Sequence, residues 1–259
     1  MLDRHYVPYP QWGIRPVLFT INGIDIPSYS FFIFLAICIG AIIYYHDSKK
    51  QNLADENSFY IALAALLGGT IGAKIPSWIF NYRQIVSSFP DLTLLMSGRT
   101  IVGGLIGGTA SVYFAKKYFK ITGKRGNLFA PAVALGMAIG RIGCFLRGCC
   151  YGITTNLPIG VDFGDGVHRH PTQIYESLFW IAMFIILLKL RKKFVTPGIL
   201  FKILLTAYFI FRFILEFIKY KTDAIIGINF YQFIIPLILL YLYRWQLITT
   251  FITLQKVKK

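Results

Sequence analysis

The chain has 259 residues, of which 56% are hydrophobic and 15% charged. Soluble domains carry about 45–50% apolar and about 25% charged residues, so the composition excludes an ordinary soluble domain. The net charge of +16 would suit a nucleic-acid binder, but the basic residues fall mainly in alternate connections between apolar runs, as in membrane proteins. We therefore expect no nucleic-acid partner.

Seven apolar runs are long enough to cross a bilayer, which takes about 20 residues each. The predicted spans are 27–46, 58–80, 101–118, 127–147, 172–190, 198–218 and 228–247. We predict an all-α integral membrane protein with seven transmembrane helices, forming a single polytopic domain over residues 1–259. Residues 1–25 show no continuous apolar stretch before a cleavage site, so the first span is expected to act as its own insertion signal.

The basic residues predict the orientation in the membrane. They follow the first, third, fifth and seventh spans: Lys49, Lys50; Lys116, Lys117, Lys120, Lys124, Arg125; Lys189, Arg191, Lys192, Lys193; Lys256, Lys258, Lys259. Because positive charge accumulates in cytoplasmic connections, the N-terminus is expected outside and the C-terminus in the cytoplasm. The irregular connections 81–100, 148–171 and 219–227 then face outward, where we expect the chemistry.

Several ionisable residues lie at membrane depth. Lys74 is in the second span, Arg141 ends the fourth, and Arg212 and Glu216 stand four apart on one face of the sixth. Such a residue costs about 2.5–3.5 kcal/mol to insert, so it normally faces a partner or a water-filled cavity. Arg212 and Glu216 either form an ion pair that holds helices together or belong to a functional site.

Arg141, Arg147 and Arg169 are predicted to gather near one outer boundary without matching acids. A guanidinium binds phosphate with two parallel hydrogen bonds, so this group favours a phosphate ligand. The alternative is that each arginine only extends from the membrane interface into water.

Two glycine patches, Gly68 to Gly72 and Gly103 to Gly108, favour close helix packing in lipid. Glycines also leave room for a lipid headgroup, and this alternative stays open.

The segment "RHPTQIYE" (Arg169 to Glu176) is typical of a helix start, with Pro171 near the first turn. Glu176 there suits the helix dipole, which would be a purely local role. His168 and His170 are candidate proton carriers near neutral pH.

The cysteines Cys144, Cys149 and Cys150 have a spacing that matches no standard zinc pattern, and we expect no metal. Three roles stay open: small buried hydrophobes, a disulfide from Cys144 to Cys149 or Cys150, or a nucleophile. Cys38 lies in mid-span and is expected to pack.

Several of these segments together resemble the prolipoprotein diacylglyceryl transferase family. The family signature Gly-Arg-x-Gly-Asn-Phe-x-Asn-x-Glu is matched by "GRIGCFLRGC" at Gly140, Arg141, Gly143 and Phe145. The family's Arg-His-Pro-Ser-Gln-x-Tyr-Glu segment is matched by "RHPTQIYE", and its Phe-Arg-x-x-x-Glu-Phe segment by "FRFILEF". "GGLIGG" and "PSYSFFIFLAICIG", with its tyrosine at Tyr29, match the third and first helices.

The resemblance implies a multi-pass enzyme of the bacterial cytoplasmic (inner) membrane that uses no cofactor. Such an enzyme takes the anionic lipid phosphatidylglycerol, moves its diacylglyceryl group to the cysteine thiol of a lipoprotein precursor, and releases glycerol phosphate. Arg141 and Arg212 would neutralise negative charge on the phosphate, with Glu216 holding Arg212. His170 or Glu176 would take the proton from the acceptor thiol.

The resemblance also suggests residues that bind the lipid and orient its donor oxygens. These are Tyr29, Gly103, Gly104, Gly143, Arg147, Arg169, Gln173 and Tyr175.

Four positions differ from the family pattern. The histidine before the glycine patch, proposed as a base in the family, is Val102 here, and the signature's two asparagines and glutamate are Cys144, Arg147 and Cys149. Two alternatives follow: a relative that transfers a phospholipid-derived group to a different acceptor, or a non-catalytic lipid-binding or transport protein.

Overall fold

The computed structural model describes residues 12–87, 98, 100–123, 125–193, 196–219, 224–225, 228–229, 235–238 and 243. Within these residues, long helices occupy the first six predicted apolar runs: α1 Ser28–Lys50, α2 Glu56–Phe80, α5 Ile101–Tyr118, α6 Gly126–Arg147, α7 Thr172–Leu190 and α8 Ile199–Leu215. A short helix, α3 Tyr82–Ser87, follows α2. Most of the seventh predicted span, 228–247, lies outside the described residues.

Four helices in the described part of the chain are long and apolar enough to cross a membrane: α1, α2, α6 and α7. The side chains of α1, α2 and α7 are largely exposed on the surface of the protein, as lipid-facing helices require, whereas those of α6 are more than half buried. The chain is therefore a mostly helical, multi-pass membrane protein.

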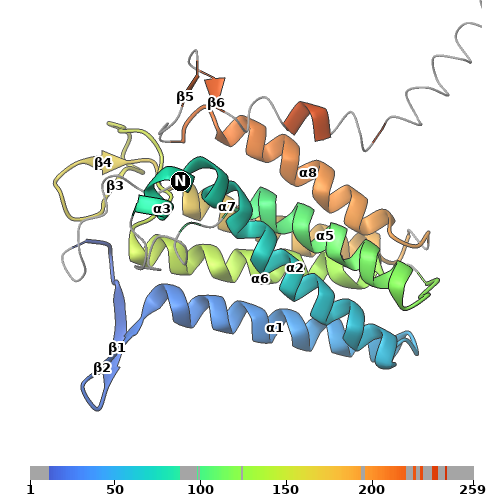
Figure 1. Cartoon of the computed structure of the whole chain (residues 1–259). Coiled ribbons are helices and arrows are strands. Elements are labelled where there is room, and N and C mark those ends of the chain that lie inside the picture. The colour runs from blue at the N-terminus through green and yellow to red at the C-terminus, as the bar shows by residue number, and fades with distance from the viewer. Residues whose placement is uncertain are drawn as a thin grey trace, which may run out of the picture.

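In the part of the chain that the structure describes, three short antiparallel hairpins interrupt the helical pattern. They pair β1 Val17–Ile21 with β2 Ile24–Pro27, β3 Val161–Asp162 with β4 His168–Arg169, and β5 Ala224–Ile225 with β6 Ile228–Asn229. Figure 1 shows all three, together with α3, at one end of the helix bundle, which we call the strand end. At the opposite end, the basic end, α1 finishes with Lys49 and Lys50 and α5 with Lys116 and Lys117.

Helix α6 lies at the centre of the fold and packs against α1, α7 and α8. It approaches α1 closely, because a Cβ on Gly143 would lie only 2.8 Å from the Cβ of Phe32. On its contact with α7, the Ser177 hydroxyl donates to the carbonyl of Ala138 at 3.0 Å. Small residues on α6 thus let its neighbours come near enough to position the side chains at its end.

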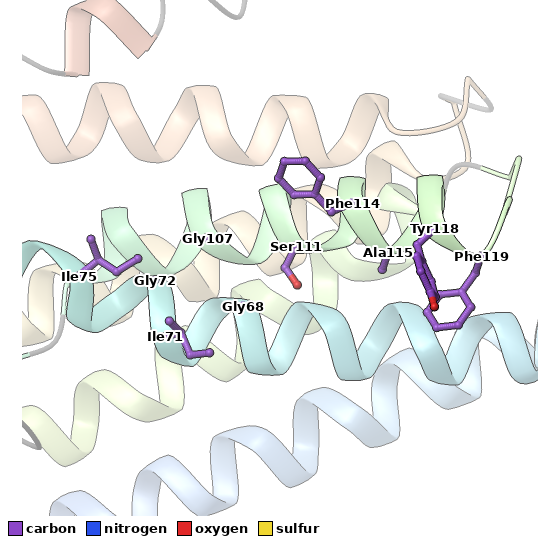
Figure 2. Close-up of a pocket in the computed structure, with 10 residues that line it drawn as sticks. All are labelled: Gly68, Ile71, Gly72, Ile75, Gly107, Ser111, Phe114, Ala115, Tyr118 and Phe119. Carbon is purple, nitrogen blue, oxygen red and sulfur yellow. The ribbon is translucent and has the colours of Figure 1, made fainter.

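Helices α2 and α5 pack along their glycine patches, which confirms the prediction of close packing. A Cβ on Gly72 would lie 2.6 Å from the carbonyl oxygen of Gly103, and one on Gly107 would lie 2.5 Å from that of Gly68. An apolar groove of about 540 Å³ runs along this contact. Figure 2 shows the residues that line it, with Ile75 at one end and Phe119 at the other.

The segment before β1 is fastened over the end of α6. The Trp12 indole donates to the carbonyl of Gly148 at 2.7 Å, and the Gly13 amide donates to that of Phe163 at 2.8 Å. Gly13 has a positive φ of +111° and Gly148 one of +74°. A Cβ on Gly13 would lie 2.5 Å from the Arg147 carbonyl oxygen, and one on Gly148 would lie 2.9 Å from the Cα of Gly13. Only glycine fits either position without strain.

Candidate active site

The candidate site is built around Glu176, a fully buried carboxylate in the first turns of α7. Three cations from separate segments reach it. Arg141 of α6 pairs with Oε2, Arg212 of α8 lies 3.4 Å from Oε1, and Nζ of Lys219, just after α8, lies 3.2 Å from Oε1. One carboxylate therefore brings together segments that are more than 70 residues apart in sequence.

Arg212 also pairs with Glu216, one turn further along the chain, at 2.7 Å. The ion pair expected from their four-residue spacing is present. Glu216 is fully buried like Glu176, so the guanidinium is held between two carboxylates. We call these five residues, Arg141, Glu176, Arg212, Glu216 and Lys219, the Glu176 cluster.

The Glu176 cluster carries more positive than negative charge. Its three cations and two carboxylates, all ionised, leave a net charge of +1, and each residue is at most 9% exposed. Buried charge is costly unless it is paired. One further monoanion would neutralise the group, and a phosphodiester is such an anion with oxygens that suit guanidinium donors.

Lys219 is the member that the sequence analysis missed, because it falls in a predicted outward connection. It stands seven residues after Arg212 and three after Glu216, which places all three on one helical face. From this spacing the sequence could have indicated that Lys219 lies beside Arg212 and Glu216. Lys219 is held in place by the strand end, where its backbone bridges to Gly152.

The start of α7 is tied to the cysteine segment. Nε2 of Gln173 donates to the carbonyl of Cys149, and the Thr172 hydroxyl donates to that of Cys150, each at 2.6 Å. Gln173 is fully buried, and its Oε1 accepts no hydrogen bond from the described residues. The site thus contains an amide oxygen that can accept a bond from a ligand.

No disulfide joins any of the four cysteines. Cys144 is buried beside Arg141, whose Nη1 lies 3.9 Å from its sulfur, and Cys149 donates to the Cys144 carbonyl at 3.6 Å. These two cysteines lie together at the edge of the Glu176 cluster.

Arg169 is not among the contacts of Glu176. Its guanidinium binds Asp165 through two bonds of 2.7 and 2.6 Å and lies over the rings of Trp12 and Tyr151. These hydrogen bonds hold the pKa of Asp165 below its usual value. The expectation that Arg169 lacks a matching acid is wrong, because Asp165, four residues earlier, provides it.

Arg147 also lies apart from Arg141. Its guanidinium sits 5.2 Å from the ring centroid of Tyr29, in the first turn of α1. The three arginines that the sequence analysis grouped thus have three different environments, and only Arg141 belongs to the Glu176 cluster.

His170 and Tyr175 contact each other, with Nδ1 and the phenol oxygen 3.1 Å apart. The backbone of His170 is fixed as well, since its carbonyl accepts from Gly152 and its amide donates to Ile153. His168 is exposed in β4.

The glycines predicted to bind substrate lie at helix contacts. A Cβ on Gly103 would clash with the Gly72 carbonyl oxygen, one on Gly104 would lie 3.3 Å from the Gly69 carbonyl oxygen, and Gly143 faces α1. Of the two roles left open for the glycine patches, packing is the one that these contacts support.

These features define a multi-pass membrane protein with a buried, cation-rich site at one end of its helices. A profile of the prolipoprotein diacylglyceryl transferase family matches residues 16–249. The chain is 37% identical over 213 residues to the phosphatidylglycerol–prolipoprotein diacylglyceryl transferase of Clostridium tetani, covering 80% of this chain and 86% of that protein.

Proteins of the same name from Clostridioides difficile and Chlorobaculum tepidum are 35% and 32% identical. These matches cover 81% and 88% of this chain, and 84% and 86% of the relatives. The chain belongs to the prolipoprotein diacylglyceryl transferase family.

Proposed function

We propose that this protein transfers the diacylglyceryl group of phosphatidylglycerol to the cysteine thiol of a lipoprotein precursor and releases glycerol phosphate. The names of its relatives supply the reaction. The observation that carries the proposal is the surplus positive charge of the Glu176 cluster, buried where a phosphate could neutralise it.

In this proposal Arg141, Arg212 and Lys219 hold the donor phosphate. The phosphodiester has one negative charge, and the leaving glycerol phosphate gains a second as the carbon–oxygen bond breaks. Cations fixed beside that oxygen stabilise the transition state more than the ground state. Glu176 and Glu216 are positioning residues, because they hold the guanidinium groups before the lipid arrives.

The lipid headgroup also has hydroxyls, and Gln173 offers a partner. Its buried Oε1 would accept a bond from a glycerol hydroxyl, while its Nε2 stays anchored on Cys149. Tyr29 and Arg147, whose ring and guanidinium contact each other at the start of α1, would also contact the lipid.

The acceptor thiol must lose its proton before it attacks. Both oxygens of Glu176 face cations, which disfavour its protonation and make it a poor base. Of the two bases suggested by the family resemblance, His170 is the better candidate, since Tyr175 orients its ring.

The proposal includes the arrangement in the membrane. The single domain would cross the bacterial inner membrane seven times, with the N-terminus outside and the C-terminus in the cytoplasm. The lysines that close α1 and α5 support a cytoplasmic basic end. The strand end and the Glu176 cluster would then lie at the outer surface.

The test uses purified protein in detergent, phosphatidylglycerol, and a peptide that carries one acceptor cysteine. The expected products are glycerol phosphate and a diacylglyceryl thioether on the peptide, both measured by mass spectrometry. Arg141→Ala should abolish both products, whereas Arg125→Ala, at the basic end, should keep them.

Two results would contradict the proposal in different ways. Release of glycerol phosphate with an unmodified peptide would show a different acceptor. The absence of turnover with any anionic phospholipid would favour a lipid-binding protein without catalysis.

A further inference from the structure

Trp180 of α7 is a fully buried side chain with an unsatisfied polar atom. Its indole nitrogen, Nε1, has no hydrogen-bond acceptor among the described residues. An indole N–H is a donor only, and buried polar groups nearly always have a partner. Trp180 stands four residues after Glu176, which places both side chains on one face of α7. An unsatisfied donor therefore lies one helical turn from the centre of the candidate site.

The ring of Trp180 stacks on that of Tyr208 in α8, with centroids 4.6 Å apart and planes at 25°. Tyr208 stands four residues before Arg212, which contacts Glu176. Helix α7 begins at the strand end and α8 finishes there, so both rings lie one turn further from the strand end than the ion pair (Figure 1). The ring pair thus lies deeper in the membrane than the Glu176 cluster.

The depth of the ring pair matches the structure of a glycerophospholipid. Four residues of helix rise about 6 Å along the axis. The polar interface of a bilayer is about 5–7 Å thick on each side of the hydrocarbon core. A phospholipid has its phosphate on the outer side of this layer and its acyl ester groups on the inner side. With the phosphate on the Glu176 cluster, an ester carbonyl would lie at the depth of Trp180.

Two further rings lie between Trp180 and the surface of the protein. Phe179 of α7 and Phe211 of α8 stack with centroids 4.2 Å apart, and both are partly buried. The ring centroid of Phe179 is also 5.5 Å from that of Trp180 and 6.3 Å from that of Tyr208. The path along these rings is aromatic, which suits the acyl chains of a lipid rather than its headgroup.

Packing alone does not account for an indole at this position. Trp180 belongs to an apolar core with Met183 and Leu187 of the same helix, where phenylalanine would pack without an unsatisfied donor. An acceptor that enters with a ligand would satisfy the N–H. In the proposed function the phosphate oxygens bind the cations one turn away. The acyl ester carbonyl, which only accepts hydrogen bonds, is the group of the lipid that matches Trp180.

We propose that Trp180 binds an acyl ester carbonyl of the donor lipid through its indole N–H. This inference rests on the proposed function and names the part of the lipid that the deeper half of the site recognises. The Glu176 cluster holds the phosphate, which leaves, and Trp180 holds the diacylglyceryl group, which is transferred. The carbon–oxygen bond that breaks is then fixed on both sides. The site should therefore prefer ester-linked to ether-linked lipids.

The first measurement compares two phosphatidylglycerols, one with acyl ester chains and one with ether-linked alkyl chains of the same length. Both have the phosphate, the glycerol hydroxyls and the bond that breaks, but the dialkyl lipid has no carbonyl. One hydrogen bond typically changes an affinity by about three- to tenfold, so the wild type should bind the diacyl lipid more tightly by this factor. Lipid-dependent thermal stabilisation in detergent measures both affinities.

Trp180→Phe is the variant that tests the hydrogen bond. Phenylalanine keeps an aromatic ring for Tyr208 but has no N–H, so this variant should bind the two lipids with equal affinity. Any loss of packing affects both lipids alike, so the ratio of the two affinities reports the hydrogen bond separately from the stability of the fold.

Trp12→Phe is the matched control. It also removes an indole N–H, but the acceptor of that bond is the Gly148 carbonyl at 2.7 Å, within the protein. This variant should keep the preference of the wild type for the diacyl lipid.

The second measurement is lipidation of the acceptor peptide with each lipid as the donor. A carbonyl that is bound equally in the ground state and the transition state lowers KM without raising kcat. Trp180→Phe should therefore raise KM for the diacyl lipid by about three- to tenfold, with the effect on KM rather than on kcat. A purely structural role would lower kcat with both lipids.

The outcomes distinguish this inference from the function on which it rests. Peptide lipidation by a wild type that has no preference for the diacyl lipid, or by a Trp180→Phe variant that keeps it, would overturn the inference and leave the function standing. A preference in lipid binding that Trp180→Phe abolishes, without any peptide lipidation by the wild type, would support the ester contact and contradict the transfer reaction. Binding of neither lipid would contradict both.

Discussion

The Glu176 cluster at the strand end and the ion pairs at the basic end use the same side chains differently. At the basic end Arg191 pairs with Asp47 at 2.5 Å, and Arg125 binds Asp55 at 3.0 Å and the carbonyl of Leu53 at 2.5 Å. Each of these two arginines has its own acid. In the Glu176 cluster, three cations share Glu176, and among the described residues only Arg212 also pairs with a second carboxylate.

This difference separates a structural ion pair from a site. A pair with matched charges needs nothing more, and its partly exposed members can stay hydrated. A fully buried group with surplus positive charge is stable enough to fold but gains further stability from an added anion. The comparison predicts that changes in the Glu176 cluster act on catalysis and those at the basic end act on stability alone.

The largest effect is expected for Arg141→Ala or Arg212→Ala. Loss of one preorganised donor to developing charge typically costs about 10²–10³-fold in turnover. Lysine at the same positions should restore only part of the rate, because it cannot bind with two parallel bonds. Lipidation of an acceptor peptide measures the effect. Full activity of either alanine variant would contradict the proposal that these arginines bind the phosphate.

Glu176→Gln should have the next largest effect, and it should lower both the turnover and the free energy of unfolding. Without this carboxylate, Arg141, Arg212 and Lys219 are buried with only Glu216 to balance them. Removal of one partner from a buried ion pair typically costs about 3–5 kcal/mol in the free energy of unfolding. Thermal unfolding in detergent measures this loss, and an anionic phospholipid should recover more stability in the variant than in wild type.

Arg125→Ala should lower stability without affecting catalysis. The substitution removes bonds to Asp55, Ser58 and Leu53. Unsatisfied buried groups cost about 1–3 kcal/mol, so a drop of this size in the free energy of unfolding is expected. A loss of turnover at temperatures where the variant stays folded would contradict the division between the two ends.

The smallest effect is expected for Asp165→Asn, which removes the partner of Arg169 in the hairpin loop. This pair is partly exposed, so its loss should cost less than about 1 kcal/mol. Because the folded pKa of Asp165 lies below its unfolded value, the pair stabilises above the unfolded pKa and is lost as pH falls through the folded one. The free energy of unfolding of the variant should therefore lack the pH dependence that this pair contributes, which acid unfolding of variant and wild type measures.

The bounds of six helices were predicted closely from the sequence, because the length of an apolar run and the position of a glycine patch are both local features of a membrane-spanning helix. α2 was expected at 58–80 and is Glu56–Phe80; α7 was expected at 172–190 and is Thr172–Leu190. The sequence also placed Arg212 beside Glu216, since four residues make one helical turn.

The remainder of the site depends on tertiary contacts that spacing does not encode. Arg169 was predicted to bind phosphate because its partner Asp165 lies in an irregular loop, where spacing does not predict contacts. Lys219 was overlooked because it lies just past the helix end. The convergence of α6, α7 and α8 on Glu176 follows from packing, which places Arg141 and Arg212 near each other although 71 residues separate them.

The contact between Gly13 and Gly148 has an evolutionary consequence. A Cβ on Gly148 would meet the Cα of Gly13, a Cβ on Gly13 would meet the carbonyl of Arg147 just before Gly148, and each glycine has a backbone conformation that disfavours any other residue. A substitution at one position therefore requires the N-terminal segment to lift from the end of α6, which removes the contact that constrains the other. In a survey of relatives the two glycines should be kept together or lost together, although 135 positions separate them.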